Sequence, residues 1–218
     1  EGSRAAAAGG VTSFMDMPNV KPPTVTNELL REKQQIAREN AVVNYSFYLG
    51  ATVDNIDEIR NVDPHTTCGV KVFMGSSTGN MLVDSPEALE RIFAESPVLI
   101  ATHCEDTPTI NRNLALLQEM LGDNIPTYCH PVIRSREACY KSSSLAAALA
   151  REHNSRLHIL HLSTEEEVAL LDEGPRKEKR ITGEVCVHHL WFNSKAYITK
   201  GSLVKWNPAI KAESDRKA

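Results

Sequence analysis

The chain has 218 residues, of which 41% are hydrophobic and 24% are charged. This length and composition allow one substantial buried core, and they exclude a disordered chain and a mini-protein that needs disulfide bonds to fold. The formal net charge is −4, and the Lys and Arg residues are scattered among acidic ones. A nucleic-acid partner is therefore not expected.

The sequence shows neither a membrane segment nor a disulfide pattern. No apolar run approaches the roughly 18 residues of a membrane span, and no signal-like segment opens the chain. The five cysteines are odd in number and lack CxxC spacing, which argues against a disulfide framework and against a zinc finger. We therefore expect a cytoplasmic protein without a membrane partner.

Strand-like and helix-like segments alternate along the chain, which is typical of parallel α/β proteins. The strand-like segments are rich in Val, Ile, Phe and Leu, and most are apolar on both faces, as buried parallel strands are. The expected strands are residues 11–17, 43–50, 69–74, 98–103, 157–162 and 181–192.

The helix-like segments carry recognisable start signals. Ser85 with Pro86 supplies an N-cap and a first-turn proline, and Ser163 with Glu166 forms a capping-box pattern. The expected helices are residues 1–8, 27–40, 111–122, 137–153 and 213–218, together with one that starts at Pro86 and one that follows Ser163.

Six strand–helix units are visible, and they predict an incomplete TIM-type (β/α)₈ barrel that lacks an outer unit at each end. A doubly wound sheet is the alternative, although no G-x-G-x-x-G follows any strand. Helix-like residues at both ends of the chain indicate an excised fragment. Residues 75–84 and 123–136 are long enough to be functional loops, and we expect residues 75–80 to form a mobile loop at the barrel mouth.

Two histidines stand at strand ends. His103 follows the apolar run 98–101, and His161 follows the apolar run 157–160. Polar residues at the carboxyl ends of parallel barrel strands face the site, so both rings can converge on one metal ion. The alternative for each is an ordinary hydrogen-bonded core histidine.

Lys71 lies inside an apolar strand-like segment, where burial of a charged ammonium is costly. Burial favours the neutral amine, and a neutral amine can take up carbon dioxide to become a carbamate that bridges two divalent cations. The alternative is a lysine whose ammonium extends out of the barrel mouth into water.

Other polar residues give weaker signals. His188 and His189 are expected on one strand, so alternation would point them to opposite faces. His130 and Arg134 belong to a loop that they could order without touching substrate. Serine-hydrolase and phosphate-binding functions are not predicted, because the sequence contains neither G-x-S-x-G nor G-x-x-x-x-G-K-[ST].

Asn19 and Asn207 are amides beside prolines, where a role in a turn is the simplest interpretation.

Taken in series, these segments resemble dihydroorotase, of the amidohydrolase superfamily, over essentially the whole chain. The matching segments are residues 2–13 followed by 15–19, then 69–76, 103–106, 158–164 and 187–190, with Asn207-Pro208.

The resemblance implies that residues 1–218 are the central part of a single (β/α)₈ barrel domain with a binuclear zinc site. It implies interconversion of N-carbamoyl-L-aspartate and L-dihydroorotate in pyrimidine biosynthesis. Lys71 would be the carboxylated lysine bridging two Zn²⁺, and His103 and His161 would bind the second of them. Asn19 and Asn207 match positions that contact the small-molecule substrate. A homodimer is a further family-level expectation.

Two family motifs are expected outside this sequence. The His-x-His-x-Arg strand, with two ligands of the first metal, would precede Glu1, and the Asp-x-Ala-Pro-His stretch, with the catalytic aspartate, would follow Ala218. No catalytic residue is therefore assigned within the chain, and the 218 residues alone are expected to show no turnover.

Two alternatives remain open. Hydantoinases and allantoinases share the lysine and both histidines. Met17-Pro18-Asn19 favours dihydroorotase over hydantoinases, which usually lack it, whereas allantoinases carry a related form. A dihydroorotase-like protein without activity could instead serve as a structural partner of aspartate transcarbamoylase. Such proteins typically lose metal ligands, whereas Lys71, His103 and His161 are retained.

Overall fold

The computed structural model describes residues 1–75 and 81–218 and divides into two compact units. The first unit comprises Glu1–Phe73 and the described part of Ser77–Ala101. The second comprises Thr102–Ala218 and the described part of Met74–Ser76. Apart from Gly75, the loop expected at residues 75–80 lies outside the described residues.

The strands follow one another in hydrogen-bonded order β1-β2-β3-β4-β5-β6, and the pairs β1–β2, β2–β3 and β5–β6 are parallel. A doubly wound sheet reverses its strand order part-way, whereas a barrel always steps in the same direction. The fold is therefore that of consecutive units of a TIM-type (β/α)₈ barrel. The strands are β1 Ser13–Asp16, β2 Asn44–Gly50, β3 Gly69–Phe73, β4 Ile100–His103, β5 Leu157–Ile159 and β6 Ile181–Gly183.

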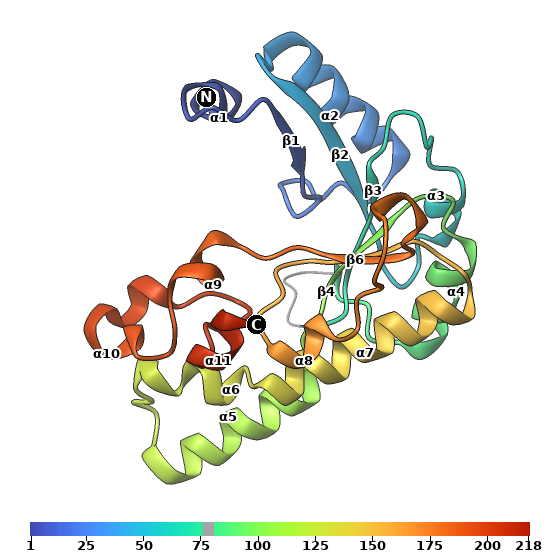
Figure 1. The fold of residues 1–218 in the computed structure, drawn as a ribbon. Helices are drawn as coiled ribbons and strands as arrows, with labels where there is room; N and C mark the ends of the chain where they lie inside the picture. Colours follow the sequence, from blue (N-terminus) through green and yellow to red (C-terminus); the bar gives the residue numbers. More distant parts are fainter. Residues whose placement is uncertain (76–80) are drawn as a thin grey trace. The chain divides into compact units, whose positions relative to one another are not determined.

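In the first unit, helix α2 lies beside strand β2 (Figure 1). Its N-cap is Thr26, whose hydroxyl accepts a hydrogen bond from the backbone N–H of Leu29. Helix α4 begins as predicted, with Ser85 as its N-cap and Pro86 in its first turn. The helices of this unit are α1 Gly2–Ala8, α2 Asn27–Asn40, α3 Ile56–Arg60 and α4 Pro86–Glu95.

In the second unit, the long helices α5 and α7 contact one another (Figure 1). Helix α5 begins four residues earlier than expected because Asp106 acts as its N-cap and accepts from the backbone N–H of Thr109. The helices of this unit are α5 Thr107–Leu121, α6 His130–Ile133, α7 Arg136–Glu152, α8 Glu165–Val168, α9 Val187–Trp191, α10 Ala196–Lys200 and α11 Glu213–Lys217, with 3₁₀ turns η2 Thr127–Cys129, η3 Arg176–Glu178 and η4 Gly201–Val204.

The last predicted strand, 181–192, is wrong in its second half. Strand β6 ends at Gly183, and residues 187–191 form helix α9. His188 and His189 therefore lie on a helix, and the prediction that strand alternation points them to opposite faces is wrong.

The capping box expected at Ser163 and Glu166 is displaced by one residue. Thr164 is the N-cap of α8, and its hydroxyl accepts from the backbone N–H of Glu167. The carboxylate of Glu167 in turn accepts from the backbone N–H of Ser163 and from the hydroxyl of Ser143. Its burial against these donors selects this register.

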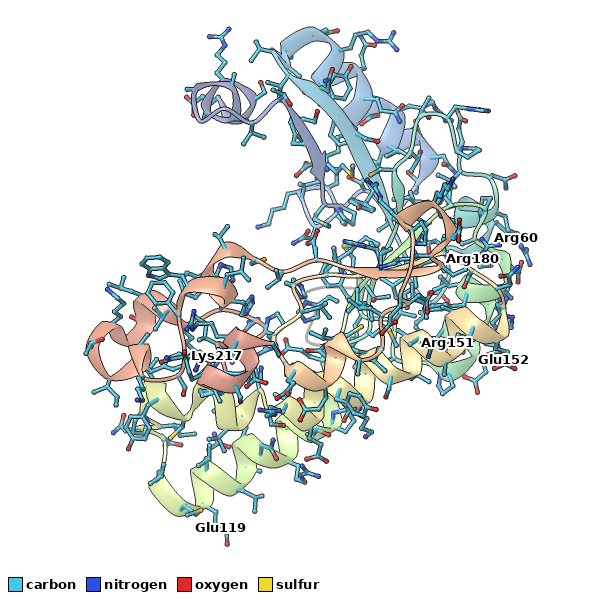
Figure 2. All side chains as sticks on the ribbon, in the orientation of Figure 1. Arg60, Glu119, Arg151, Glu152, Arg180 and Lys217 are labelled. Atoms are coloured by element: carbon cyan, nitrogen blue, oxygen red, sulfur yellow. The ribbon has the colours of Figure 1, made fainter. Side chains whose placement is uncertain are left out.

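Two glutamates illustrate the solvent-facing surface of the second unit. On α5 and at the end of α7, Glu119 and Glu152 point away from the ribbon into solvent (Figure 2). Within the described residues, no helix combines the length and the apolar character that a membrane crossing requires. All five cysteines are described, and none of them forms a disulfide.

Candidate metal centre

The second unit brings His103 and His161 together. His103 is the last residue of β4, and His161 follows β5 by two residues. The Nδ1 atom of His103 lies 3.0 Å from the Nε2 atom of His161, and the two ring planes are inclined by 78°. The strand-end position of each histidine thus places its ring beside the other, as expected for parallel barrel strands.

The chain makes a sharp turn at His161. Its φ angle is +41°, in the left-handed region that few residues other than glycine adopt, although histidine is among those that tolerate it. The next residue resumes pairing along the sheet, because the backbone N–H of Leu162 donates to the carbonyl of Glu184 at 2.8 Å.

Glu105 fixes the orientation of His103. Its Oε2 atom lies 3.0 Å from Nε2 of His103, and the same oxygen forms an ion pair with the guanidinium of Arg134. Burial raises the pKa of Glu105, but the hydrogen bond to His103 and the charge of Arg134 together lower it by more. The net pKa is below the usual value, and the carboxyl is ionised at neutral pH. An ionised carboxylate only accepts, so Nε2 of His103 carries a proton and Nδ1 keeps its lone pair.

The backbone of Glu105 lies directly against Gly75. A Cβ atom at position 75 would come within 1.6 Å of the carbonyl oxygen of Glu105, a separation that no packing adjustment accommodates. Position 75 therefore requires glycine.

The two imidazoles fit a shared divalent cation. Nitrogens bound to one tetrahedral Zn²⁺ at about 2.0–2.1 Å are roughly 3.3 Å apart, close to the 3.0 Å between Nδ1 of His103 and Nε2 of His161. Binding needs Nε2 of His161 to be deprotonated, which the other tautomer of that ring provides. The hydrogen bond from His103 to Glu105 matches the carboxylate–histidine support that metal ligands commonly have.

In the first unit, Lys71 is buried in the middle of β3. Only 2% of its surface is exposed, so the alternative of an ammonium extending into water is excluded. Its Nζ atom donates to the carbonyl of Val72 at 3.1 Å and lies 3.8 Å from the centre of the Phe73 ring. The structure thus confirms the predicted burial of Lys71 within a strand.

The two asparagines predicted to contact substrate are exposed. Asn19 lies in the loop after β1 in the first unit. In the second unit, the side-chain oxygen of Asn207 lies 3.1 Å from Nε2 of His130, and the same nitrogen lies 2.8 Å from the carbonyl of Trp206. Since carbonyl oxygens only accept, Nε2 of His130 is the donor, and His130 holds the Trp206–Asn207 segment in place.

His188 and His189 form a second pair in the second unit. The His188 ring stacks on the Trp206 ring at 4.4 Å between centroids with 10° between planes. The Nε2 atom of His189 donates to the carbonyl of Pro208 at 3.1 Å. Burial lowers the pKa of His189 to about 4, so its ring is neutral at neutral pH.

Sequence reasoning missed the roles of three charged groups in the second unit, of which Glu105 and Lys211 are buried and Arg134 is half-buried. Glu105 could have been found, because a residue two positions after His103 in extended chain shares its face. Arg134 was expected only to order its loop, and its pairing with Glu105 brings it to the candidate metal centre. Lys211 carried no signal: its Nζ atom is buried against the Ala209 carbonyl and the Ser163 hydroxyl, at 3.0 and 3.3 Å.

Comparisons with known proteins identify relatives along the entire chain. No family model matches it. A dihydroorotase of Methanosarcina mazei is 33% identical over 100% of this chain and 48% of its own length, and an allantoinase of Deinococcus radiodurans is 29% identical over 96% and 48%. The chain thus spans about half the length of the relatives it matches.

Solved structures share the fold. The L-hydantoinase (dihydropyrimidinase) of Arthrobacter aurescens superposes with a TM-score of 0.90 at 24% identity, covering 99% of this chain and 48% of that one. The inactive dihydroorotase-like domain of the Chaetomium thermophilum CAD-like multifunctional protein superposes with a TM-score of 0.63 at 19% identity, covering 99% of this chain and 52% of that one.

Proposed function

Because the chain belongs to the amidohydrolase superfamily, we propose that the protein hydrolyses a cyclic amide, and that this amide is L-dihydroorotate, which opens to N-carbamoyl-L-aspartate. The observation that carries the proposal is the contact between Nδ1 of His103 and Nε2 of His161 beside the ionised Glu105. The Met17-Pro18-Asn19 run favours dihydroorotate over hydantoin, as does the similarity to archaeal dihydroorotases.

We assign the metal ligands of the proposed zinc pair by the chemistry of their donor atoms. His103 would bind through Nδ1 and His161 through Nε2, with Glu105 holding the His103 ring and Arg134 holding Glu105. When bound, the metals supply Lewis-acid polarisation of the amide carbonyl and activation of water. The protein's own part is to keep the His103 ring in the ligating tautomer and to exclude the solvent that would compete for Glu105.

Lys71 would be the carboxylated bridge between the metals. Its neutral Nζ attacks the carbon of CO₂, one C=O electron pair moves to oxygen, and the nitrogen loses a proton to solvent, which leaves an anionic carbamate. A buried amine supports this step, because burial disfavours the ammonium and the carbamate gains its charge compensation from the cations.

Asn19 and Asn207 are proposed to contact the substrate. His130 donates to the side-chain oxygen of Asn207, which fixes the orientation of the amide group. The NH₂ group of Asn207 can then donate to a carboxylate or carbonyl of the substrate. The homodimer, the association with aspartate transcarbamoylase and the lack of turnover in residues 1–218 alone stay predictions.

A substrate panel tests the reaction. The full-length protein is assayed with dihydroorotate, hydantoin and allantoin, and we expect turnover of dihydroorotate to exceed that of the other two. Preferential turnover of allantoin or hydantoin would replace dihydroorotate as the substrate while keeping the reaction class.

A Lys71→Ala variant tests the bridge. We expect it to lose activity and to regain part of it when a short-chain carboxylic acid is added, because the free carboxylate can replace the carbamate. Isotopically labelled bicarbonate should give a carbamate NMR signal in the wild type that this variant lacks. Lys141→Ala, which removes an exposed lysine, is the control. Full activity in Lys71→Ala would exclude the bridging role.

Metal content separates the enzyme from a structural homologue. We expect at least two zinc ions per full-length subunit, the content of a binuclear site. A content near zero, together with no turnover on the panel, would favour the inactive structural role instead.

A further inference from the structure

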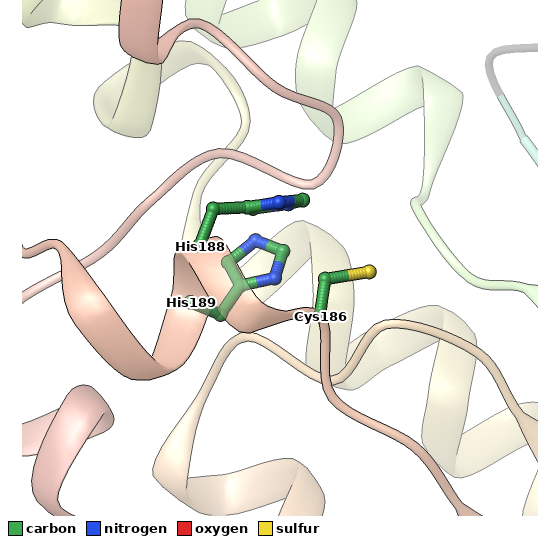
Figure 3. A group of neighbouring side chains, drawn as sticks. All are labelled: Cys186, His188 and His189. Atoms are coloured by element: carbon green, nitrogen blue, oxygen red, sulfur yellow. The ribbon is translucent and has the colours of Figure 1, made fainter. Parts of the chain in front are cut away.

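A second cluster of metal-ligating side chains lies around the start of helix α9. Cys186 immediately precedes this helix, and His188 and His189 are in its first turns. One ligand atom from each of the three residues lies within 4.8 Å of the others. Figure 3 shows the thiol and the two rings extending to the same side of the chain. These residues are separate from His103 and His161.

The buried ring of His189 directs a lone pair into this cluster. Its Nε2 atom is committed as the donor to the Pro208 carbonyl, so Nδ1 keeps its lone pair. The side chain is only 7% exposed, and Nδ1 has no hydrogen-bond partner among the described residues. An acceptor nitrogen held in a buried position without a donor costs free energy, which a bound cation would offset.

The other two side chains suit the same ion. The His188 ring is held in place by its stacking on Trp206 and lies 4.5 Å from the His189 ring. Cys186 is half-buried and forms no disulfide, so its sulfur is available as a soft ligand. One thiolate and two imidazoles are a donor set that Zn²⁺ prefers.

We propose that Cys186, His188 and His189 form a mononuclear Zn²⁺ site, with water as the fourth ligand. The Cys186 thiol releases its proton to solvent as the zinc–sulfur bond forms, and neither imidazole changes its charge. Tetrahedral zinc ligands are about 3.3–3.6 Å apart, so ligand atoms that lie up to 4.8 Å apart must approach by up to about 1.5 Å, which needs rotation of the Cys186 side chain and a small slide of the His188 ring along the Trp206 ring. The ion would fix the two rings that contact Trp206 and Pro208.

Cobalt substitution of the full-length protein tests this site, because Co²⁺ bound to a thiolate absorbs strongly in the near ultraviolet and the donors assigned to the His103–His161 centre include no sulfur. We expect the thiolate band in the wild type and in His161→Ala, its loss in Cys186→Ser, and a shifted, weaker band in His188→Phe. Phenylalanine keeps the stacking on Trp206 and removes the nitrogen. Cys68→Ser, which removes another half-buried thiol, should leave the band unchanged.

A second measurement needs no variant at all. At free Zn²⁺ ten times the dissociation constant, alkylation of Cys186 should slow about tenfold while that of Cys68 is unchanged. The proposal is overturned if the wild type lacks the thiolate band, if Cys186→Ser retains it, or if Zn²⁺ leaves alkylation of Cys186 unaffected. None of these results depends on turnover of dihydroorotate, so they stand apart from the test of the proposed function.

Discussion

The pair formed by His103 and His161 and the pair formed by His188 and His189 differ in what holds their rings. An ionised carboxylate, Glu105, holds the His103 ring of the first pair, whereas a neutral backbone carbonyl, that of Pro208, holds the His189 ring of the second. A carboxylate raises the basicity of the ring it supports, while a carbonyl only selects the tautomer. The first pair is therefore suited to a catalytic cation and the second to a structural one.

The two pairs also differ in where the chain places them. His103 and His161 follow separate strands and meet only because those strands are neighbours in the sheet. His188 and His189 are adjacent in sequence and depend on a short helix and on contacts with residues 206–208. Substitutions should therefore affect the first pair through catalysis and the second through local stability.

The largest expected effect is on catalysis. His161→Ala removes one of the proposed metal ligands and should reduce kcat for dihydroorotate by about three orders of magnitude, because the proposed metals would supply several kcal/mol of transition-state stabilisation. Steady-state kinetics of the full-length protein measure it, with the exposed His65→Ala as control. A comparable loss in His188→Phe would remove the functional distinction between the pairs.

The next effect is on stability. Arg134→Met leaves the fully buried Glu105 carboxylate without its main cation and should lower the free energy of unfolding by about 3 kcal/mol. Urea unfolding measures it. Adding Glu105→Gln to this variant should recover part of the loss, since the uncompensated charge is then gone. If the double variant is no more stable than Arg134→Met, the ion pair is not the cause.

Metal affinity should respond to the carboxylate itself. Glu105→Gln keeps the size of the side chain but weakens its support of His103, so we expect Zn²⁺ affinity to fall about 10–100-fold. Competition with a chelator measures this, and Glu166→Gln on the surface is the matched control. Unchanged Zn²⁺ affinity would show that Glu105 stabilises the fold but does not orient His103 for metal binding.

The smallest effect concerns the segment that holds His189. Burial raises the pKa of Tyr197 to about 12, and its hydroxyl accepts from the backbone N–H of Ile210, two residues after Pro208. The folded-state pKa of Tyr197 lies above the usual value of 10. The contribution of the buried neutral phenol to the free energy of unfolding is therefore fully present below pH 10 and is lost as the pH rises toward 12.

The loss should reach on the order of 2 kcal/mol in the wild type, and Tyr197→Phe should remove this part of the alkaline dependence. Urea unfolding between about pH 9 and pH 12, roughly the range over which Tyr197 titrates, measures the difference. Identical pH profiles for the two proteins would contradict the assignment.

The sequence predicted the strand order and three candidate ligands because buried strands and strand-end histidines have local signatures. It did not predict α9, since the run from Val187 to Phe192 is as apolar and aromatic as a strand, and only contacts with Trp206 and Pro208 select the helix. The capping register at α8 was ambiguous because Ser163 and Thr164 precede three consecutive glutamates, and burial of Glu167 against Ser143 decides it.

The pairings of Arg134 and Lys211 were equally beyond local patterns. Arg134 reaches Glu105 from 29 residues away along the chain, and no spacing rule links the two. Lys211 is buried among neutral acceptors from Ala209 and Ser163, an environment that only the folded chain creates. Long-range pairings of this kind are what composition and periodicity leave undetermined.

The contact between Gly75 and Glu105 has a practical consequence for mutational surveys. Any side chain at position 75 would displace the peptide that carries Glu105, and with it the imidazole that Glu105 steadies. Random mutagenesis should therefore return inactive clones at a position that bears no functional group. Such clones would be misread as loop defects unless their zinc content were measured as well.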